Sequence, residues 1–313
     1  MTHVPDMKKG VIAGIGAYLL WGFLPIYWKL VDHVSALEIL AHRIVWSFLF
    51  LMLLFIVTRK VAYFIEDLRY LRTHPKIIVG IMTSSLLISA NWILFIWAVA
   101  NERIVEVSLG YYINPLINVI LGVIFFKETL NNKQRAAVGL AFIGVLIMTV
   151  SFGQVPYIAL TLAFSFGLYG LVKKQTQVGA MTGLSIETLM LLPVALGVLF
   201  YLQGSVSGIL HVGSEVPLTP VLLIGTGVAT AIPLLLFGFG ARNISLSLIG
   251  FLQYIAPTTM LLLGVLLYGE AFTVYHAISF VFIWTGLILY SVSKFSVFRE
   301  EKRLRENNIK SRA

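Results

Sequence analysis

The feature that most constrains the fold of this chain is a series of ten apolar stretches, each long enough to cross a bilayer as a helix. The hydrocarbon core of a bilayer is about 30 Å thick, and about 20 apolar residues in helical form cross it. The predicted spans are residues 10–28, 36–57, 77–100, 105–126, 136–150, 156–172, 184–202, 219–240, 246–268 and 274–292. They occupy most of the 313 residues and leave little chain for a water-soluble domain. We therefore predict an all-α membrane protein with ten transmembrane helices.

Composition agrees with a membrane protein and excludes several kinds of chemistry. Hydrophobic residues make up 58% of the chain and charged residues 12%, whereas soluble domains carry about 25% charged residues. The chain has no cysteine, which excludes disulfides, a thiol nucleophile and thiolate-bound metals. Neither a glycine-rich phosphate loop nor an HExxH zinc motif is present. We therefore expect no cofactor, no metal and no catalytic residue.

The basic residues predict how the chain is oriented in the membrane. With a cytoplasmic N-terminus, nearly all of the 23 lysines and arginines lie in cytoplasmic segments; Lys29 and Arg103 lie on the opposite side, and Arg43 lies within the second span. This excess is the positive-inside pattern, so we predict that both termini are cytoplasmic. The net charge of +9 then indicates contact with anionic lipids rather than with nucleic acid. The first span is interpreted as a retained helix because no small-residue cleavage site follows Trp28.

The second half of the chain repeats the first. Shifted by 142 residues, Asn101 aligns with Asn243, Pro115 with Pro257 and Glu128 with Glu270. Nearer the start of each half the offset drifts: it is 144 for Lys29 and Lys173, and 149 for Glu38 and Glu187. We therefore predict a five-helix repeat over residues 1–151, a second over residues 152–298, and a basic cytoplasmic tail over residues 299–313. Because five is odd, the two repeats enter the membrane from opposite sides.

Inverted repeats are typical of secondary transporters, which bind substrate near the membrane midplane between the two halves. We therefore predict transport of small organic molecules by alternating access, with export as the leading direction. An intramembrane lipid-modifying enzyme and a membrane signalling or scaffold protein are the alternatives. Either a proton-coupled transporter or an uncoupled facilitator fits the residues, and the chain could act as a monomer or a homodimer.

Several motifs resemble a known family. They are the runs WGFLPIYWK at residues 21–29, ANW at 90–92 and WAV at 97–99, SLGYYINPL at 108–116, and GFLQYIAPT at 250–258. Together they resemble the RarD-type branch of the EamA family, within the drug/metabolite transporter superfamily. The resemblance extends from Lys9 to about Ser296. It implies a ten-helix transporter of the bacterial inner membrane with both termini in the cytoplasm, and it leaves the substrate open.

The fourth and ninth spans carry the clearest candidates for substrate binding. Tyr111, Asn114 and Asn118 have the i, i+3, i+7 spacing of one helix face, and Gln253 lies on the equivalent face of the ninth span. Aromatic side chains could stack on an organic substrate, although many aromatic residues in membrane proteins only mark the interface. The predicted substrate-binding residues are Trp21, Asn91, Trp92, Tyr111, Tyr112, Asn114, Tyr169, Gln253 and Tyr254.

Ionisable residues within the spans are candidates for ion coupling, because such residues are costly in lipid and usually face a partner or a cavity. Glu38 and His42 are four residues apart and so share a helix face, and Arg43 follows directly. Glu187 has the repeat-related position in the seventh span. The alternative is that Glu38, His42 and Arg43 simply reach the headgroups at the outer end of their span.

Pro115 and Pro257 are the candidates for gating. Neither can donate a backbone hydrogen bond, so each frees a carbonyl deep within a span, at Tyr111 and at Gln253. Such breaks are tolerated where they line a cavity or where neighbouring helices satisfy the freed group. The alternative interpretation is a purely structural kink with packed amides.

Overall fold

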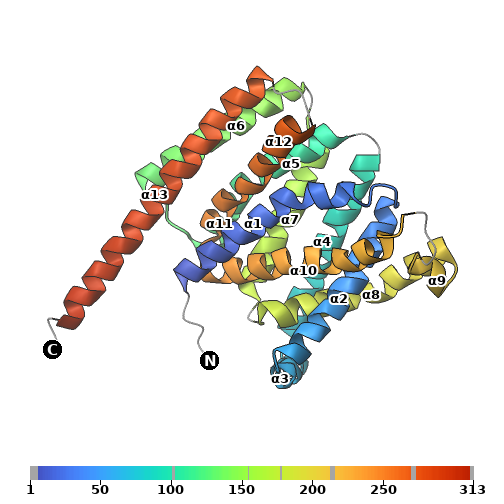
Figure 1. Cartoon of the computed structure of the whole chain (residues 1–313). Coiled ribbons are helices and arrows are strands. Elements are labelled where there is room, and N and C mark those ends of the chain that lie inside the picture. The colour runs from blue at the N-terminus through green and yellow to red at the C-terminus, as the bar shows by residue number, and fades with distance from the viewer. Residues whose placement is uncertain are drawn as a thin grey trace.

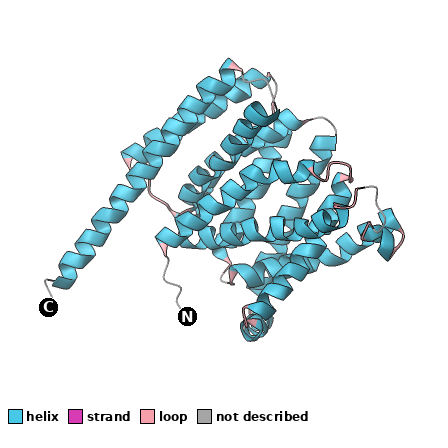
Figure 2. Ribbon diagram, in the orientation of Figure 1, coloured by secondary structure: helices cyan, strands magenta, loops and turns pink. Residues whose placement is uncertain are grey.

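The computed structural model describes residues 6–100, 103–153, 155–176, 178–211, 216–268 and 273–310. These residues are helical almost throughout (Figure 2). Nine helices among them are long and apolar enough to cross a membrane. The helices are α1 (Met7–Lys29), α2 (Ala36–Val57), α3 (Val61–Thr73), α4 (Pro75–Ala100), α5 (Ile104–Phe126), α6 (Asn132–Phe152), α7 (Tyr157–Gln175), α8 (Ala180–Gln203), α9 (Val206–Ile209), α10 (Thr219–Asn243), α11 (Leu246–Gln253), α12 (Ile255–Tyr268) and α13 (Val274–Lys310). The prediction of an all-helical membrane protein is confirmed.

The predicted spans differ from the observed helices in four places. The predicted span 156–172 forms helix α7, which is not among the nine and carries Lys173 and Lys174 in its last turn. Helix α3 and the short helix α9 were not predicted. The predicted span 246–268 is divided into α11 and α12. The predicted tail does not begin a new element, because α13 continues without a break to Lys310.

Local sequence explains where several helices begin and end. Asp6 accepts a hydrogen bond from the backbone N–H of Lys9 at the start of α1, at 3.1 Å. Asn131 and Gln134 form a reciprocal capping box at the start of α6, which satisfies two otherwise free backbone donors. Helix α6 ends at Gly153, whose φ of 79° is a left-handed conformation that glycine adopts without steric cost.

The two predicted proline breaks behave differently. Helix α11 ends at Gln253 and α12 begins at Ile255, so the chain is interrupted where Pro257 cannot donate to the carbonyl of Gln253. Helix α5 runs through Pro115 as one helix. The repeat-related prolines therefore give one broken helix and one continuous helix.

The helices form a bundle with a separate pair at one side. Helices α6 and α13 lie side by side along their length, and α13 extends beyond the bundle toward the C-terminus (Figure 1). In the main bundle α10 contacts α1 and α2, α7 contacts α4 and α5, and α2 contacts α8. The α2–α10 contact is close, because a Cβ at Gly227 would lie 2.3 Å from the backbone carbonyl carbon of Trp46. A larger residue at position 227 would therefore push these two helices apart.

Candidate functional site: an aromatic cavity between two buried carboxylates

The central feature of the structure is a cavity of about 390 Å³. Pockets of about 300–1,000 Å³ are typical of small-molecule sites. Its residues come from the second halves of α1 and α4 and the first halves of α2, α5 and α7, with further residues from α10, α11 and α12. These halves meet at the end of the bundle where α1 is followed by α2, which is the end away from the N-terminus (Figure 1).

Most of the residues predicted to bind substrate line this cavity. The lining residues from that prediction are Trp21, Asn91, Trp92, Tyr111, Asn114 and Gln253. Pro257 also lines it, whereas Pro115 does not. Arg43, predicted for coupling, is a lining residue as well. Whether these residues bind a substrate remains a prediction.

Three predicted binding residues lie elsewhere: Tyr112, Tyr169 and Tyr254 do not line the cavity. They are 3%, 0% and 0% exposed and belong to the packed core. The ring of Tyr169 stacks on Phe237, and its hydroxyl donates to Glu187 at 3.4 Å. These tyrosines therefore pack helices together rather than face the cavity.

An amide network forms one wall of the cavity and links the two halves of the chain. The Nδ2 group of Asn118 donates to Oδ1 of Asn114 and to Oε1 of Gln253, each at 3.0 Å. Asn114 donates in turn to the carbonyl of Ala163 at 2.6 Å. Hydrogen-bonding partners satisfy most of these buried polar atoms, as the cost of burying free amides requires. The network therefore holds α5, α7 and α11 together at the break in the ninth predicted span.

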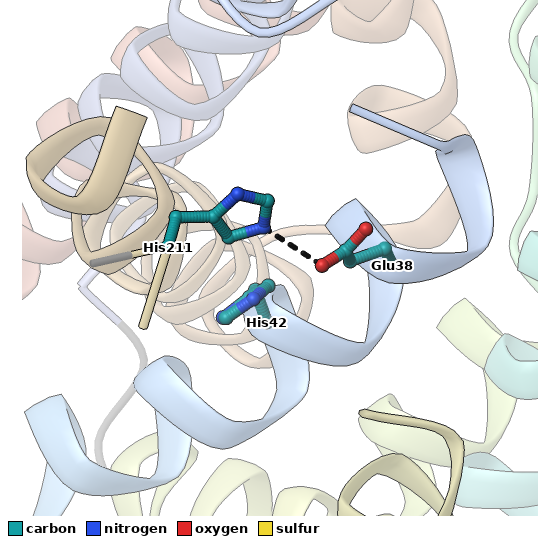
Figure 3. Close-up of side chains that lie close together, drawn as sticks. All are labelled: Glu38, His42 and His211. Atoms are coloured by element: carbon teal, nitrogen blue, oxygen red, sulfur yellow. Dashed lines mark hydrogen bonds and ion pairs between the residues drawn. The ribbon is translucent and has the colours of Figure 1, made fainter. Parts of the chain in front are cut away.

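Glu38 lies in a cluster with two histidines at the N-terminal end of α2 (Figure 3). His211, in the segment between α9 and α10, contacts Oε1 of Glu38 through Nε2 at 2.8 Å. Gln203 donates to the same oxygen at 2.5 Å. His42, one turn along α2, has a ring centroid 6.2 Å from that of His211. Glu38 is therefore held by side chains of the second half of the chain.

The tautomer of His42 decides what this cluster can bind. The ligand atoms of Glu38, His42 and His211 lie within 4.8 Å of one another, which is a spacing that could admit a metal ion. The indole of Trp46 donates to Nδ1 of His42 at 3.2 Å, and an indole can only donate. The proton of a neutral His42 is therefore on Nε2, which has no partner among the described residues. That nitrogen could ligate a metal only after the Trp46 hydrogen bond broke, and a second proton on Nδ1 would break the same bond, so the arrangement fits a neutral imidazole.

Glu187 lies at the opposite end of the bundle and has a different partner. It forms an ion pair of 2.8 Å with Lys173, and both side chains are buried. Ser84 also donates to the carboxylate of Glu187. Because a buried charge is costly unless it is paired, the contact joins α4, α7 and α8 firmly at this end.

Sequence reasoning missed His211 and the pairing of Lys173 with Glu187. Lys29 recurs as Lys173 and Glu38 as Glu187, at offsets of 144 and 149, and this recurrence of both members was a weak signal for the Lys173–Glu187 pair. His211 and Gln203 lie in a segment with no repeat-related motif, and no sequence signal indicated them.

Comparisons with known proteins give a consistent result. The profile of the EamA-like transporter family matches residues 8–150. "Uncharacterized transporter YojE" of Bacillus subtilis (strain 168) is 45% identical over 302 residues, which cover 96% of this chain and 99% of that protein. "Protein RarD" of Escherichia coli (strain K12) is 45% identical over 283 residues, covering 90% and 94%. A crystal structure with 19% identity superposes with a TM-score of 0.70 over 92% of this chain and 98% of the other, a likeness of fold alone.

Proposed function

Because the chain belongs to the EamA-like transporter family, we propose that it is a secondary transporter that exports small organic metabolites or drugs across the bacterial inner membrane by alternating access. The observation that carries this proposal is the unequal state of the two ends of the bundle. A cavity occupies one end, while a buried ion pair between α7 and α8 and a hydrogen bond from Ser84 of α4 join three helices at the other. That asymmetry is what one half-cycle of alternating access requires. The transporters among the relatives favour this proposal over a lipid-modifying enzyme or a scaffold.

The proposal includes ten transmembrane helices arranged as two inverted five-helix repeats, with α11 and α12 together forming one of them. The start of α6 at Asn132 and the start of α13 at Val274 keep the offset of 142 residues found in the sequence. Contacts between helices support the same pairing. Helix α7 contacts α4 and α5, and its counterpart α1 contacts α10 and α12.

Exchange of contacts between the two repeats would open and close the pathway. In the sequence Lys29 and Glu38 are the counterparts of Lys173 and Glu187. Glu187 is paired with Lys173, whereas Glu38 contacts His211 and Gln203. We propose that the opposite state separates Lys173 from Glu187 and closes the other end around Glu38. The cavity then faces outward in the present state if the N-terminus is cytoplasmic, as the basic residues predict.

Proton coupling would use the cluster around Glu38. A histidine next to a carboxylate can change its charge near neutral pH, whereas a lysine stays charged. The direct contact of His211 with the carboxylate of Glu38 therefore supports a proton site at this end. If so, Glu38→Gln abolishes uptake driven by a pH gradient in inside-out vesicles and preserves substrate exchange. Wild-type uptake that ignores the gradient would favour an uncoupled facilitator instead.

The test uses the absence of cysteine, which makes every introduced thiol a site-specific probe. Met260→Cys lies in the cavity, and Gly238→Cys lies beside Lys173 and Glu187. A membrane-impermeant maleimide should label the first from outside intact spheroplasts and should label the second only weakly in inside-out vesicles. Adding Glu187→Gln should lower labelling at position 260 and raise it at position 238, because the ion pair that closes this end is lost.

The matched control is Ser185→Ala, also on α8, whose hydroxyl donates to the carbonyl of Met181 in its own helix. It should leave both labelling rates unchanged. If Glu187→Gln alters neither rate, or alters both in the same direction, the two sites do not open alternately and the proposed mechanism is wrong.

A further inference from the structure

We infer that the cavity takes organic anions, and that Arg43 binds the carboxylate of a substrate whose remaining body is aromatic or branched and apolar. The inference rests on the proposed function only in taking this cavity as the substrate site. Four observations carry it: the charge of the lining, the surroundings of the guanidinium, the apolar remainder of the cavity, and the engagement of the nearby carboxylate.

The described lining of the cavity is unbalanced in charge. Arg43 is a lining residue, and the lining residues whose side chains the structure describes include no aspartate and no glutamate. Among the described residues, no carboxylate forms an ion pair with Arg43. A cation within a membrane span is costly unless it finds a partner or a water-filled cavity. An anionic ligand would supply the missing charge, whereas a cationic drug would meet the arginine with no carboxylate beside it among the described lining residues.

The guanidinium is held in a way that leaves its hydrogen-bonding edge available. Its Nε–H donates to the hydroxyl of Thr230 at 2.9 Å. Its central carbon lies over two indole rings, 4.9 Å from the centroid of Trp28 and 5.1 Å from that of Trp92. These contacts fix the plane of the group, and the N–H groups of its two terminal nitrogens make no hydrogen bond to a described residue. An arginine oriented in this way is suited to bidentate binding of a carboxylate.

The rest of the cavity fits an apolar body. Trp21, Phe166 and Leu234 are among its lining residues, and the rings of Trp21 and Phe166 meet edge to face at 5.9 Å. Gln253 lines the cavity as well and uses its Oε1 to accept from Asn118. Its amide nitrogen, which is not engaged in a hydrogen bond to a described residue, is available for a second polar group on the ligand.

Glu38 does not neutralise Arg43, although it lies only five residues earlier on α2. Its carboxylate accepts from Gln203 at 2.5 Å and contacts His211 at 2.8 Å. The carboxylate is therefore engaged with Gln203 and His211, and the charge of Arg43 is available to bind a ligand.

The experiment compares ligands that share a body and differ in charge. The purified full-length protein is titrated, by isothermal calorimetry at pH 7, with 3-phenylpropionate, indole-3-acetate and octanoate, and with the neutral amide and the amine of each body. At least one carboxylate should bind about tenfold or more tightly than its own amide and amine, as expected for a charge-assisted pair of hydrogen bonds. If no body shows this preference, including the case in which nothing binds, the inference is overturned.

Substitutions then assign the preference to Arg43. Arg43→Gln should weaken binding of the preferred carboxylate about tenfold and leave the amide within about twofold. Arg69→Gln, a change at an exposed position on α3, is the matched control and should alter neither. If Arg43→Gln does not fold, Thr230→Val serves instead: it keeps the cation, removes the Nε acceptor, and should weaken the carboxylate selectively. A carboxylate preference that survives both substitutions contradicts the role of Arg43.

The two proposals can fail separately. If carboxylates bind preferentially but the two thiol probes are labelled equally, the proposal of alternating access is wrong and the proposed anion site stands. If the labelling alternates but no carboxylate is preferred over its amide and amine, the anion site is wrong and alternating access stands.

Discussion

At the scale of single residues, the Lys173–Glu187 pair is the contact whose loss should cost the most stability. Both residues are buried, at 8% and 2% exposed, so neither charge could be solvated if its partner were removed. Lys173→Met leaves the carboxylate without its cation, and we expect a loss of about 3–5 kcal/mol in the free energy of unfolding. The double variant Lys173→Met, Glu187→Met should recover most of that loss. Denaturation in mixed micelles measures both, with Lys9→Ala as a control at an exposed ion pair. Equal stability of the single and double variants would contradict the charge argument.

The same scale shows what the sequence could predict about the candidate site. Asn114 and Gln253 were found because amides are rare in apolar spans and because the offset of 142 places both on equivalent helix faces, although Asn114 aligns with Ala256 and Gln253 with Tyr111. Tyr112 and Tyr254 share that offset but lie in the core, because a repeat reports equivalence between halves and not which side of a helix faces a cavity. The contact of His211 with Glu38 joins residues 173 positions apart, and no local pattern encodes such a pair.

At the scale of elements, the broken helix α11–α12 is where we expect motion. Pro257→Ala restores a backbone donor opposite the carbonyl of Gln253, so the two helices can join. We expect transport to slow about tenfold while the melting temperature stays level or rises, because alanine favours a helix over proline. Pro115→Ala should have a smaller effect on rate, since α5 is already continuous. The rates come from substrate counterflow in proteoliposomes, and normal rates for both variants would make the prolines purely structural.

Element boundaries were predicted well where length and hydropathy decide them, and poorly elsewhere. The spans could be read from apolar runs because the bilayer sets their length. Helix α3 was missed because its apolar and polar residues are mixed, so no continuous apolar run marks it. The division of the ninth predicted span was foreseen as a kink at Pro257, but the sequence alone does not distinguish it from the unbroken helix at Pro115.

At the scale of the whole molecule, the orientation in the membrane remains a prediction from the distribution of basic residues. We expect a green fluorescent protein fused after Ala313 to be bright and an alkaline phosphatase fused there to be inactive, because both report a cytoplasmic C-terminus. A phosphatase inserted after Ser205, between α8 and α9, serves as the matched positive control and should be active. The reverse pattern would place the cavity on the cytoplasmic side and would turn the proposed exporter's present state inward.

The pairing of α6 with α13 has a consequence for how the protein can be assembled. Each is the last helix of its half of the chain, and the two lie against one another along their length (Figure 1). A Cβ at Gly286 would lie 2.7 Å from the carbonyl of Ala137, so the seam is tight enough to depend on that glycine. Two polypeptides produced from a gene divided after Gly153 would each keep one side of the seam. Co-expressed, they should associate through this seam and reconstitute the membrane protein from separate parts.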